Sequence, residues 1–172
     1  MRLIENFDSN NYDMCTGYFH REAVRAIIIK QNILALIKGE KFGEYKFPGG
    51  GKEEGESNKV TLQRETLEET GLTIKPSSIK PYGMAIEKRR SVINPDDLFQ
   101  MESFYYLCDV YEHIQETKLD DYELLFGYQL HFVSIDEAIR ANELASTIHQ
   151  QEAPWINREL AIFKDVKNKL NL

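Results

Sequence analysis

One predicted helix, with a cluster of negative charge on it, constrains this sequence more than any other feature. Residues 58–70 should form it, because Ser57 is a typical N-cap and Gly71 a typical C-terminal cap. Residues at i, i+3 and i+4 share one face of a helix, and here they are Glu65, Glu68 and Glu69. Three like charges on one face repel one another and cost stability. We therefore expect these carboxylates to serve a function.

The opposite face of this helix is predicted to meet the core. Val60 and Leu67 lie seven residues apart, roughly opposite the acidic face, so the carboxylates should point away from the protein interior. Clustered carboxylate oxygens suit a hard divalent cation, Mg²⁺ or Mn²⁺, which can also bind substrate phosphates. An acidic face that is merely solvated is the alternative interpretation.

The residues around the cluster form a longer pattern that runs from Gly50 to Leu72. Its fixed positions are Gly50, Glu56, Arg64, Glu65, Glu68, Glu69 and Gly71. In order and spacing this pattern resembles the Nudix box, whose final aliphatic residue is matched by Leu72. Thr66 departs from it, because the box has another aliphatic residue at that position.

The resemblance implies hydrolysis of a diphosphate bond, in a nucleoside diphosphate linked to a further group, with the help of divalent metal. The metal-binding carboxylates of the box match Glu65, Glu68 and Glu69. Glu56 matches a residue that helps in metal binding or loop order, and Gly50 one whose carbonyl can approach the metal. Arg64 matches the arginine that steadies the loop and its glutamates. The predicted catalytic residues are thus Glu56, Arg64, Glu65 and Glu69.

Such a reaction also needs a general base. In the family it is a box glutamate or an acidic residue of a later loop, and residues 112–127 offer Glu112, Glu116, Asp120, Asp121 and Glu123. Arg21 and Arg25 flank the first predicted strand, and Lys38 and Lys46 lie near the box in sequence. Among these, Arg25 and Lys46 are the predicted substrate-binding residues, with Arg21 and Lys38 as further candidates. The substrate is left open between a nucleoside triphosphate, an oxidised nucleotide and a nucleotide sugar, as is the number of metal ions.

A second hypothesis is a Nudix-fold module that senses a nucleotide without cutting it. The complete set of box carboxylates favours the enzyme. The net charge of −7, from 28 acidic and 21 basic residues, speaks against nucleic acid and against an anionic membrane surface as partners. A small nucleotide, held through metal ions, is the expected partner, and the resemblance allows a homodimer.

Neither a signal peptide nor a membrane span is expected from the sequence. The first residues lack a basic start followed by an apolar run, and no apolar stretch approaches the roughly 20 residues of a membrane span. The cysteines, Cys15 and Cys108, are too few and too far apart for a disulfide framework. A cytoplasmic protein is therefore expected.

The pattern of elements predicts an α/β (α+β) protein, a Nudix-type sandwich in which helices flank a mixed sheet. Residues 1–16 are predicted to be a loosely held polar lead-in, and residues 17–172 one domain that includes the C-terminal helix. Strands are expected at 24–30, 33–38, 72–75, 79–88, 99–111 and 128–133. Besides 58–70, helices are expected after Ser134 and over 154–170, whereas Pro48 and the following glycines should end regular structure, and 112–127 should be a loop.

Overall fold

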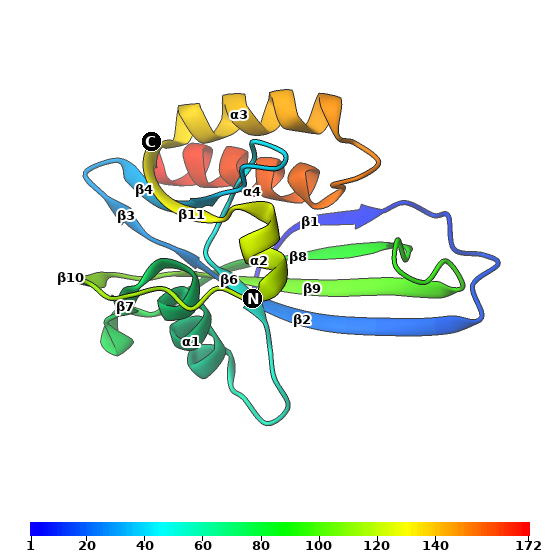
Figure 1. Cartoon of the computed structure of the whole chain (residues 1–172), viewed down its shortest axis with the longest axis horizontal. Helices are drawn as coiled ribbons and strands as arrows, with labels where there is room; N and C mark the ends of the chain where they lie inside the picture. The colour runs from blue at the N-terminus through cyan, green and yellow to red at the C-terminus, as the bar shows by residue number, and fades with distance from the viewer.

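The computed structural model describes residues 1–172, which form three layers (Figure 1). Helices α3 (Ile135–Ile148) and α4 (Trp155–Leu170) cover one face of the strands, and α1 (Asn58–Thr70) lies on the other. A short helix, α2 (Asp121–Phe126), precedes the last strand. The strands are β1 (Leu3–Asp8), β2 (Gly17–Ile27), β3 (Ile29–Lys30), β4 (Ile33–Lys38), β5 (Tyr45–Lys46), β6 (Gly49–Gly51), β7 (Leu72–Ile74), β8 (Lys80–Arg90), β9 (Asp97–Leu107), β10 (Val110–Ile114) and β11 (Gln129–Ser134). The predicted sandwich with a mixed sheet is confirmed.

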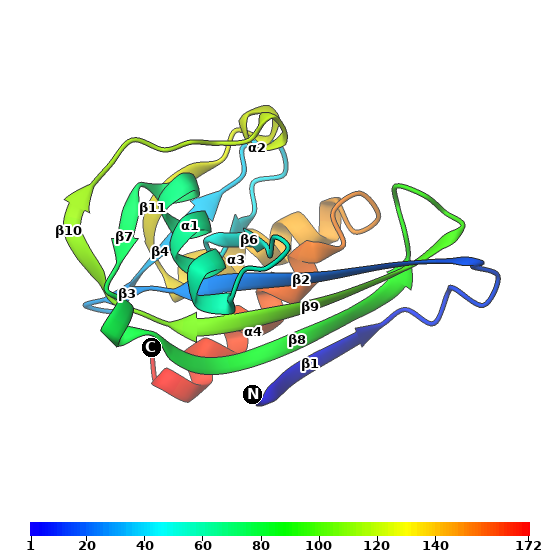
Figure 2. The same ribbon diagram turned by 90° about the horizontal axis from the view of Figure 1, so that it is seen from below.

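The larger sheet contains five strands in the order β1-β8-β9-β2-β6. β1 runs parallel to β8 and β2 parallel to β9, whereas the other neighbours are antiparallel. Figure 2 shows β1, β8, β9 and β2 side by side. β6 pairs with β2 only at Ala23–Arg25, so residues 17–21 of β2 form an open edge beside the loop that leads to α1. A second sheet has the order β11-β4-β3, with β5 paired to β4.

Two apolar clusters fill the space on either side of the larger sheet. Alternate residues of β2 face opposite ways. Val24 therefore packs in one cluster with Leu62 of α1, and Ile27 in the other with Phe163 of α4. The strand thus connects the helix that carries the acidic residues to the C-terminal helix. No helix of the structure is long and apolar enough to cross a membrane.

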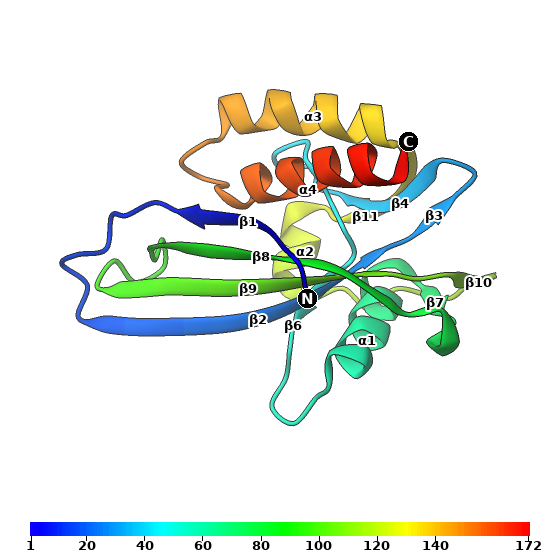
Figure 3. The same cartoon turned by 180° about the vertical axis from the view of Figure 1, so that it is seen from behind.

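The N-terminal segment differs from the predicted lead-in. Leu3–Asp8 forms β1, which lies between β8 and α4 (Figure 3). Most residues of β1 are exposed, so the segment lacks the apolar pattern by which a strand is predicted from sequence. Its strand conformation comes from pairing with β8. Arg2 extends the attachment by donating two hydrogen bonds, of 3.1 and 2.6 Å, to the Asp165 carboxylate on α4.

Other differences concern the bounds of elements. β2 begins at Gly17, seven residues before the predicted strand. Gly49–Gly51, expected to be irregular, pairs with β2 as β6. The predicted loop of residues 112–127 contains the end of β10 and all of α2, and the single strand predicted over 99–111 is divided between β9 and β10.

Because the attachment of β1 to α4 uses the Asp165 carboxylate, the free energy of unfolding should fall at acidic pH. Burial opposes ionisation of Asp165, but the hydrogen bonds from Arg2 and Tyr82 outweigh it and hold its pKa below the ordinary 3.8. A lowered pKa stabilises the fold above the ordinary value, and this contribution is lost as the pH falls through the folded-state value. We expect Asp165→Asn to lower the free energy of unfolding by about 1 kcal/mol at neutral pH. Urea unfolding followed from neutral to acidic pH should show this difference shrink below pH 3.8.

The exposed Asp13, in the same N-terminal segment, offers a matched control. Asp13→Asn should leave the unfolding curve unchanged. A difference between wild type and Asp165→Asn that stays constant down to the acid limb would contradict the role of the Asp165 charge.

Candidate active site

Helix α1 has the predicted bounds. The Ser57 side chain accepts a hydrogen bond from Val60 N, and Gly71 caps the other end in a left-handed conformation with φ of 70°. The predicted core face is wrong, however, because Val60 is 51% exposed, whereas Leu62 and Thr66 are fully buried. The helix is rotated so that Leu62 meets the apolar cluster under β2. Thr66 occupies the aliphatic position of the box, and its buried hydroxyl has no hydrogen-bond partner.

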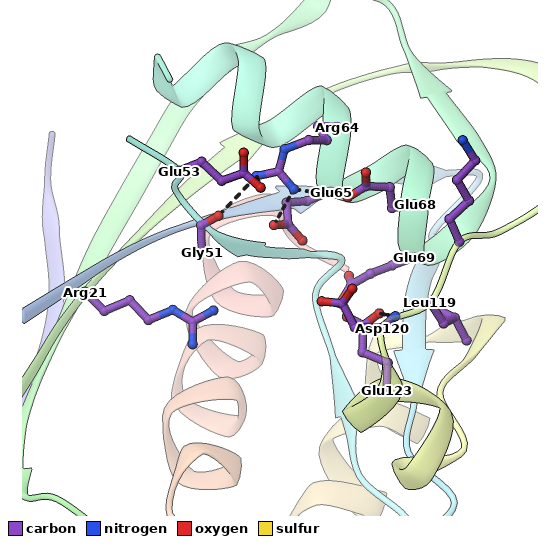
Figure 4. A pocket seen from close by; sticks show the side chains of 11 residues that line it. Arg21, Gly51, Glu53, Arg64, Glu65, Glu68, Glu69, Leu119, Asp120 and Glu123 are labelled. Carbon is purple, nitrogen blue, oxygen red and sulfur yellow. Dashed lines mark hydrogen bonds and ion pairs between the residues drawn. The ribbon is translucent and has the colours of Figure 1, made fainter. Parts of the chain in front are cut away.

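The acidic face borders a cavity of about 560 Å³ (Figure 4). Besides α1, the loop before it, β2 and the segment that leads into α2 contribute to the wall. The charged lining residues are Arg21, Glu53, Arg64, Glu65, Glu68, Glu69, Lys118, Asp120 and Glu123. Six of these are acidic and three are basic, so the cavity carries a formal charge of −3. It should therefore repel a diphosphate until cations enter.

Arg64 organises three of the box glutamates. Its Nε and Nη2 donate to the two Glu56 oxygens at 2.8 and 2.9 Å, and its Nη1 donates to Glu65 at 2.8 Å and to Glu68 at 3.1 Å. Nη2 also donates to the Gly51 carbonyl at 3.2 Å. The hydrogen bonds from Arg64 lower the pKa of Glu56 to about 2. All three guanidinium nitrogens of Arg64 thus donate to groups within the protein.

Glu69 is the most deeply buried of the predicted metal ligands, with 2% of its surface exposed. Its Oε1 accepts a hydrogen bond of 2.7 Å from Lys46 Nζ, and its Oε2 accepts one of 2.7 Å from Gly49 N. The Lys46 ammonium also lies 4.0 Å from the centre of the Tyr128 ring. Glu69 is therefore fixed in position by the chain segment that precedes the box.

Glu65 lies against the backbone of Gly50. A Cβ at position 50 would overlap the Glu65 carboxylate, so any other residue there would force this side chain to move. Burial raises the pKa of Glu65, and the nearby charge of Glu69 adds to the effect, although Arg64 opposes it. A divalent cation would relieve this cost, since it pairs the half-buried charge.

The donor chemistry of these residues fits a hard divalent cation. One Glu65 oxygen and one Glu68 oxygen make no hydrogen bond within the protein, and both residues line the cavity with Glu69. No three acidic, histidine or cysteine side chains already converge into a metal-binding group. Arg64 Nη1 is instead bonded to both Glu65 and Glu68, and Lys46 is paired with Glu69. Glu56, with both oxygens bonded to Arg64, is placed to order the loop.

Two of the predicted general-base candidates reach the cavity. They are Asp120 and Glu123, whereas Glu112, Glu116 and Asp121 do not line it. Asp120 N donates to Glu123 Oε2 at 2.8 Å across the first turn of α2. Burial, aided by the charge of Glu69, raises the pKa of Glu123 to about 7. The helix that brings these residues in was not predicted, although the Asp120-x-x-Glu123 spacing is a capping-box signal.

Arg25 and Lys46, predicted to contact substrate, lie in the protein interior and do not line the cavity. Lys46 is paired with Glu69, as described. Arg25 Nη1 donates to the carbonyls of Phe47 and Gly49 at 3.4 and 3.2 Å. Arg25 is thus tied to the chain segment that precedes the box. Instead of lining the cavity, Lys46 fixes the Glu69 carboxylate and Arg25 fixes the backbone of residues 47 and 49.

A buried carboxylate on α4, which sequence reasoning missed, completes this support. Glu159 is fully buried, and its Oε2 accepts a hydrogen bond of 3.2 Å from Phe47 N. Its Oε1 lies 3.6 Å from Arg25 Nε and accepts a hydrogen bond of 3.0 Å from Arg158 Nη2. The available signal was the position of Arg158 and Glu159 inside the apolar stripe of a helix, where unpaired charges are not tolerated.

Comparison with known proteins identifies the family of the chain. The family model described as NUDIX domain matches residues 19–157. No curated protein matches the chain. Among solved structures, a NUDIX hydrolase from Nitrosomonas europaea is similar, with 26% identity, a TM-score of 0.56, and coverage of 74% of this chain and 80% of that one. A MutT NUDIX hydrolase from Burkholderia pseudomallei shares the fold, with 18% identity, a TM-score of 0.52, and coverage of 69% and 85%. Since the family model spans most of the chain, the chain belongs to the NUDIX family and is an enzyme of its pyrophosphohydrolase class.

Proposed function

We propose that this enzyme uses Mg²⁺ or Mn²⁺ to hydrolyse a diphosphate bond in a nucleoside diphosphate linked to another group. The observation that carries the proposal is that Glu65, Glu68 and Glu69 line the same cavity. One oxygen of Glu65 and one of Glu68 make no hydrogen bond with the protein. Oxygen ligands of this kind match the preference of both ions.

The chain's own residues divide the remaining work. Glu65, Glu68 and Glu69 would hold the divalent ions, which supply charge neutralisation and Lewis acidity when bound. Arg64 orients two of these glutamates and fixes the loop through Gly51, while Lys46 and Gly49 orient the third. Such preorganisation is a large share of phosphoryl-transfer catalysis, because little covalent chemistry is asked of the protein.

Proton transfer from the attacking water falls to the acidic residues at the entry of α2. Asp120 and Glu123 line the cavity wall beside Glu69, so either can reach a water between the box and the substrate. We favour Glu123, because its side chain is held in place by Asp120 N and by the hydroxyl of Tyr122. A positioned acceptor loses less entropy on reaching the reacting geometry than a mobile one.

A substrate panel with controlled metal tests the proposal. Protein stripped with EDTA should release neither phosphate nor diphosphate from nucleoside triphosphates, oxidised purine nucleotides or nucleotide sugars, since the bare cavity repels them. Adding Mg²⁺ or Mn²⁺ should restore turnover of at least one substrate, followed by phosphate detection and chromatography of the nucleotide product. Equal turnover without metal would contradict the proposed role of the carboxylates. Binding without turnover across the whole panel would favour a nucleotide sensor.

A further inference from the structure

Arg21 and Lys118 are the two cations of the cavity whose side chains make no hydrogen bond or ion pair with the protein, and of these only Arg21 carries the planar guanidinium that can hold a phosphate through two parallel hydrogen bonds. Arg64, by contrast, is occupied by glutamates on all sides. Arg21 projects from β2 on the side of the cavity opposite Glu69, Asp120 and Glu123 (Figure 4). An unpaired guanidinium that faces a ring of carboxylates is available for an anionic ligand.

The backbone at Gly51 shapes the place of this guanidinium. A Cβ at position 51 would stand 2.6 Å from Arg21 Nη2 and 2.8 Å from its Nε, so a side chain there would displace Arg21. The same residue accepts the Arg64 hydrogen bond through its carbonyl. Gly51 thus contacts both arginines: its carbonyl binds Arg64, and its lack of a side chain leaves room for Arg21.

A second cavity, of about 610 Å³, opens on the other side of Arg21. It lies between the open edge of β2, at residues 19–22, and the loop of residues 52–55. Arg21 and Glu53 line both cavities, so the two spaces meet there. Each volume is within the range that holds a ligand of drug size.

The lining of the second cavity does not suit another phosphate. Its basic residues are Arg21 and Lys52, and its acidic residues are Glu22, Glu53 and Glu54, which gives a formal charge of −1. Lys52 is moreover neutralised by Glu22 at 2.7 Å. Phe19, 48% exposed and stacked on Phe99, offers an aromatic surface. An uncharged ring with hydrogen-bonding groups fits this combination.

From these features, and resting on the proposed function, we infer that the substrate lies along the edge of β2. Arg21 binds the diphosphate from the side opposite the box carboxylates. The uncharged sugar or nucleoside ring attached to the diphosphate occupies the second cavity against Phe19. Of the two arginines of this strand that the sequence offered as substrate contacts, Arg21 therefore takes the role, whereas Arg25, four residues further along, is buried.

Steady-state kinetics with Mg²⁺ on the best substrate of the panel, with inorganic diphosphate as a competitive inhibitor, tests this placement. Arg21→Ala should raise both KM and the inhibition constant of diphosphate about 10–100-fold, because a charge-assisted contact is lost. Gly51→Ala should raise both in the same direction by displacing Arg21. Phe19→Ala should raise KM but leave inhibition by diphosphate unchanged. Lys30→Ala, which removes an exposed cation elsewhere, should change neither.

The ring is identified by a second competition. Nucleoside 5′-monophosphates and sugar 1-phosphates are compared as inhibitors of wild type and Phe19→Ala, and the class whose inhibition weakens in the variant occupies the second cavity. If neither weakens, or if Phe19→Ala weakens inorganic diphosphate as much as Arg21→Ala does, the assignment of this cavity is overturned. Unchanged KM and diphosphate inhibition in Arg21→Ala overturn the role of Arg21.

Failure of the proposed function would give a different result. If wild type cuts no substrate, calorimetry of inorganic diphosphate binding in Mg²⁺ still decides the placement of Arg21. Binding to wild type that is lost in Arg21→Ala and kept in Lys30→Ala supports the inference, and equal binding to all three proteins overturns it.

Discussion

Replacing Glu65 with glutamine is expected to reduce kcat by roughly 10²–10³-fold, the usual loss when one electrostatic group that acts in the transition state is removed. Glu65 has a carboxylate oxygen that no protein group occupies, and Gly50 leaves room for it. Glutamine keeps the shape and the acceptor for Arg64 but removes the charge that a divalent ion needs. The measurement is turnover against Mg²⁺ concentration, in which the variant should also need far more metal for half-maximal activity.

Stability separates a catalytic role of Glu65 from a structural one. In EDTA the Glu65→Gln protein should unfold within about 1 kcal/mol of wild type, because the lost pair with Arg64 is offset by relief of repulsion from Glu68 and Glu69. Glu152→Gln, at an exposed position, is the matched control and should retain full activity. A large loss of thermal stability in Glu65→Gln without metal would mark the residue as structural.

Glu159→Ala is expected to destabilise the protein by about 3–5 kcal/mol, which is the usual cost of breaking a buried ion pair. The substitution leaves Arg25 and Arg158 in the interior with one carboxylate fewer, and it leaves Phe47 N without its acceptor. For a chain of this length, that corresponds to a fall in Tm of roughly 6–20 °C. Thermal unfolding followed by circular dichroism measures it.

A surface ion pair between α3 and α4 gives the matched control. Lys164 on α4 pairs with Glu143 at 2.8 Å, and both side chains are about half exposed. Glu143→Gln should cost less than about 1 kcal/mol. If Glu159→Ala costs no more than Glu143→Gln, the buried network does not support the fold as described.

The parts of the molecule that the sequence predicts well are those with local signals. The bounds of α1 follow from Ser57 and Gly71, because caps act within one turn of the chain. The shared cavity of Glu65, Glu68 and Glu69 follows from their spacing on that helix. The β4 strand, Ile33–Lys38, likewise has its predicted bounds, since a continuous apolar run between turns defines it.

The parts that could not be predicted depend on distant residues. β1 becomes a strand only through β8, which lies about 80 residues later. The face of α1 that is buried was misassigned, because which apolar residue meets the core depends on how the helix packs on the sheet. Arg21 and Arg25 lie on the same face of one strand, but Arg21 lines the cavity, whereas Arg25 is buried against residues 47–49 and Glu159 of α4.

The contact between Glu159 and Arg25 also bears on the order in which the protein folds. The residues that it joins are separated by 134 positions, and β2 pairs in parallel with β9 across about 80. Closing such long loops costs chain entropy before the contacts that stabilise the fold can form, so folding should be slow for a chain of this size. During synthesis, Arg25 and Lys46 are made long before α4. The loop that holds Glu69 would thus take its final form only after residue 159 has left the ribosome, and metal affinity should be the last property that the nascent chain acquires.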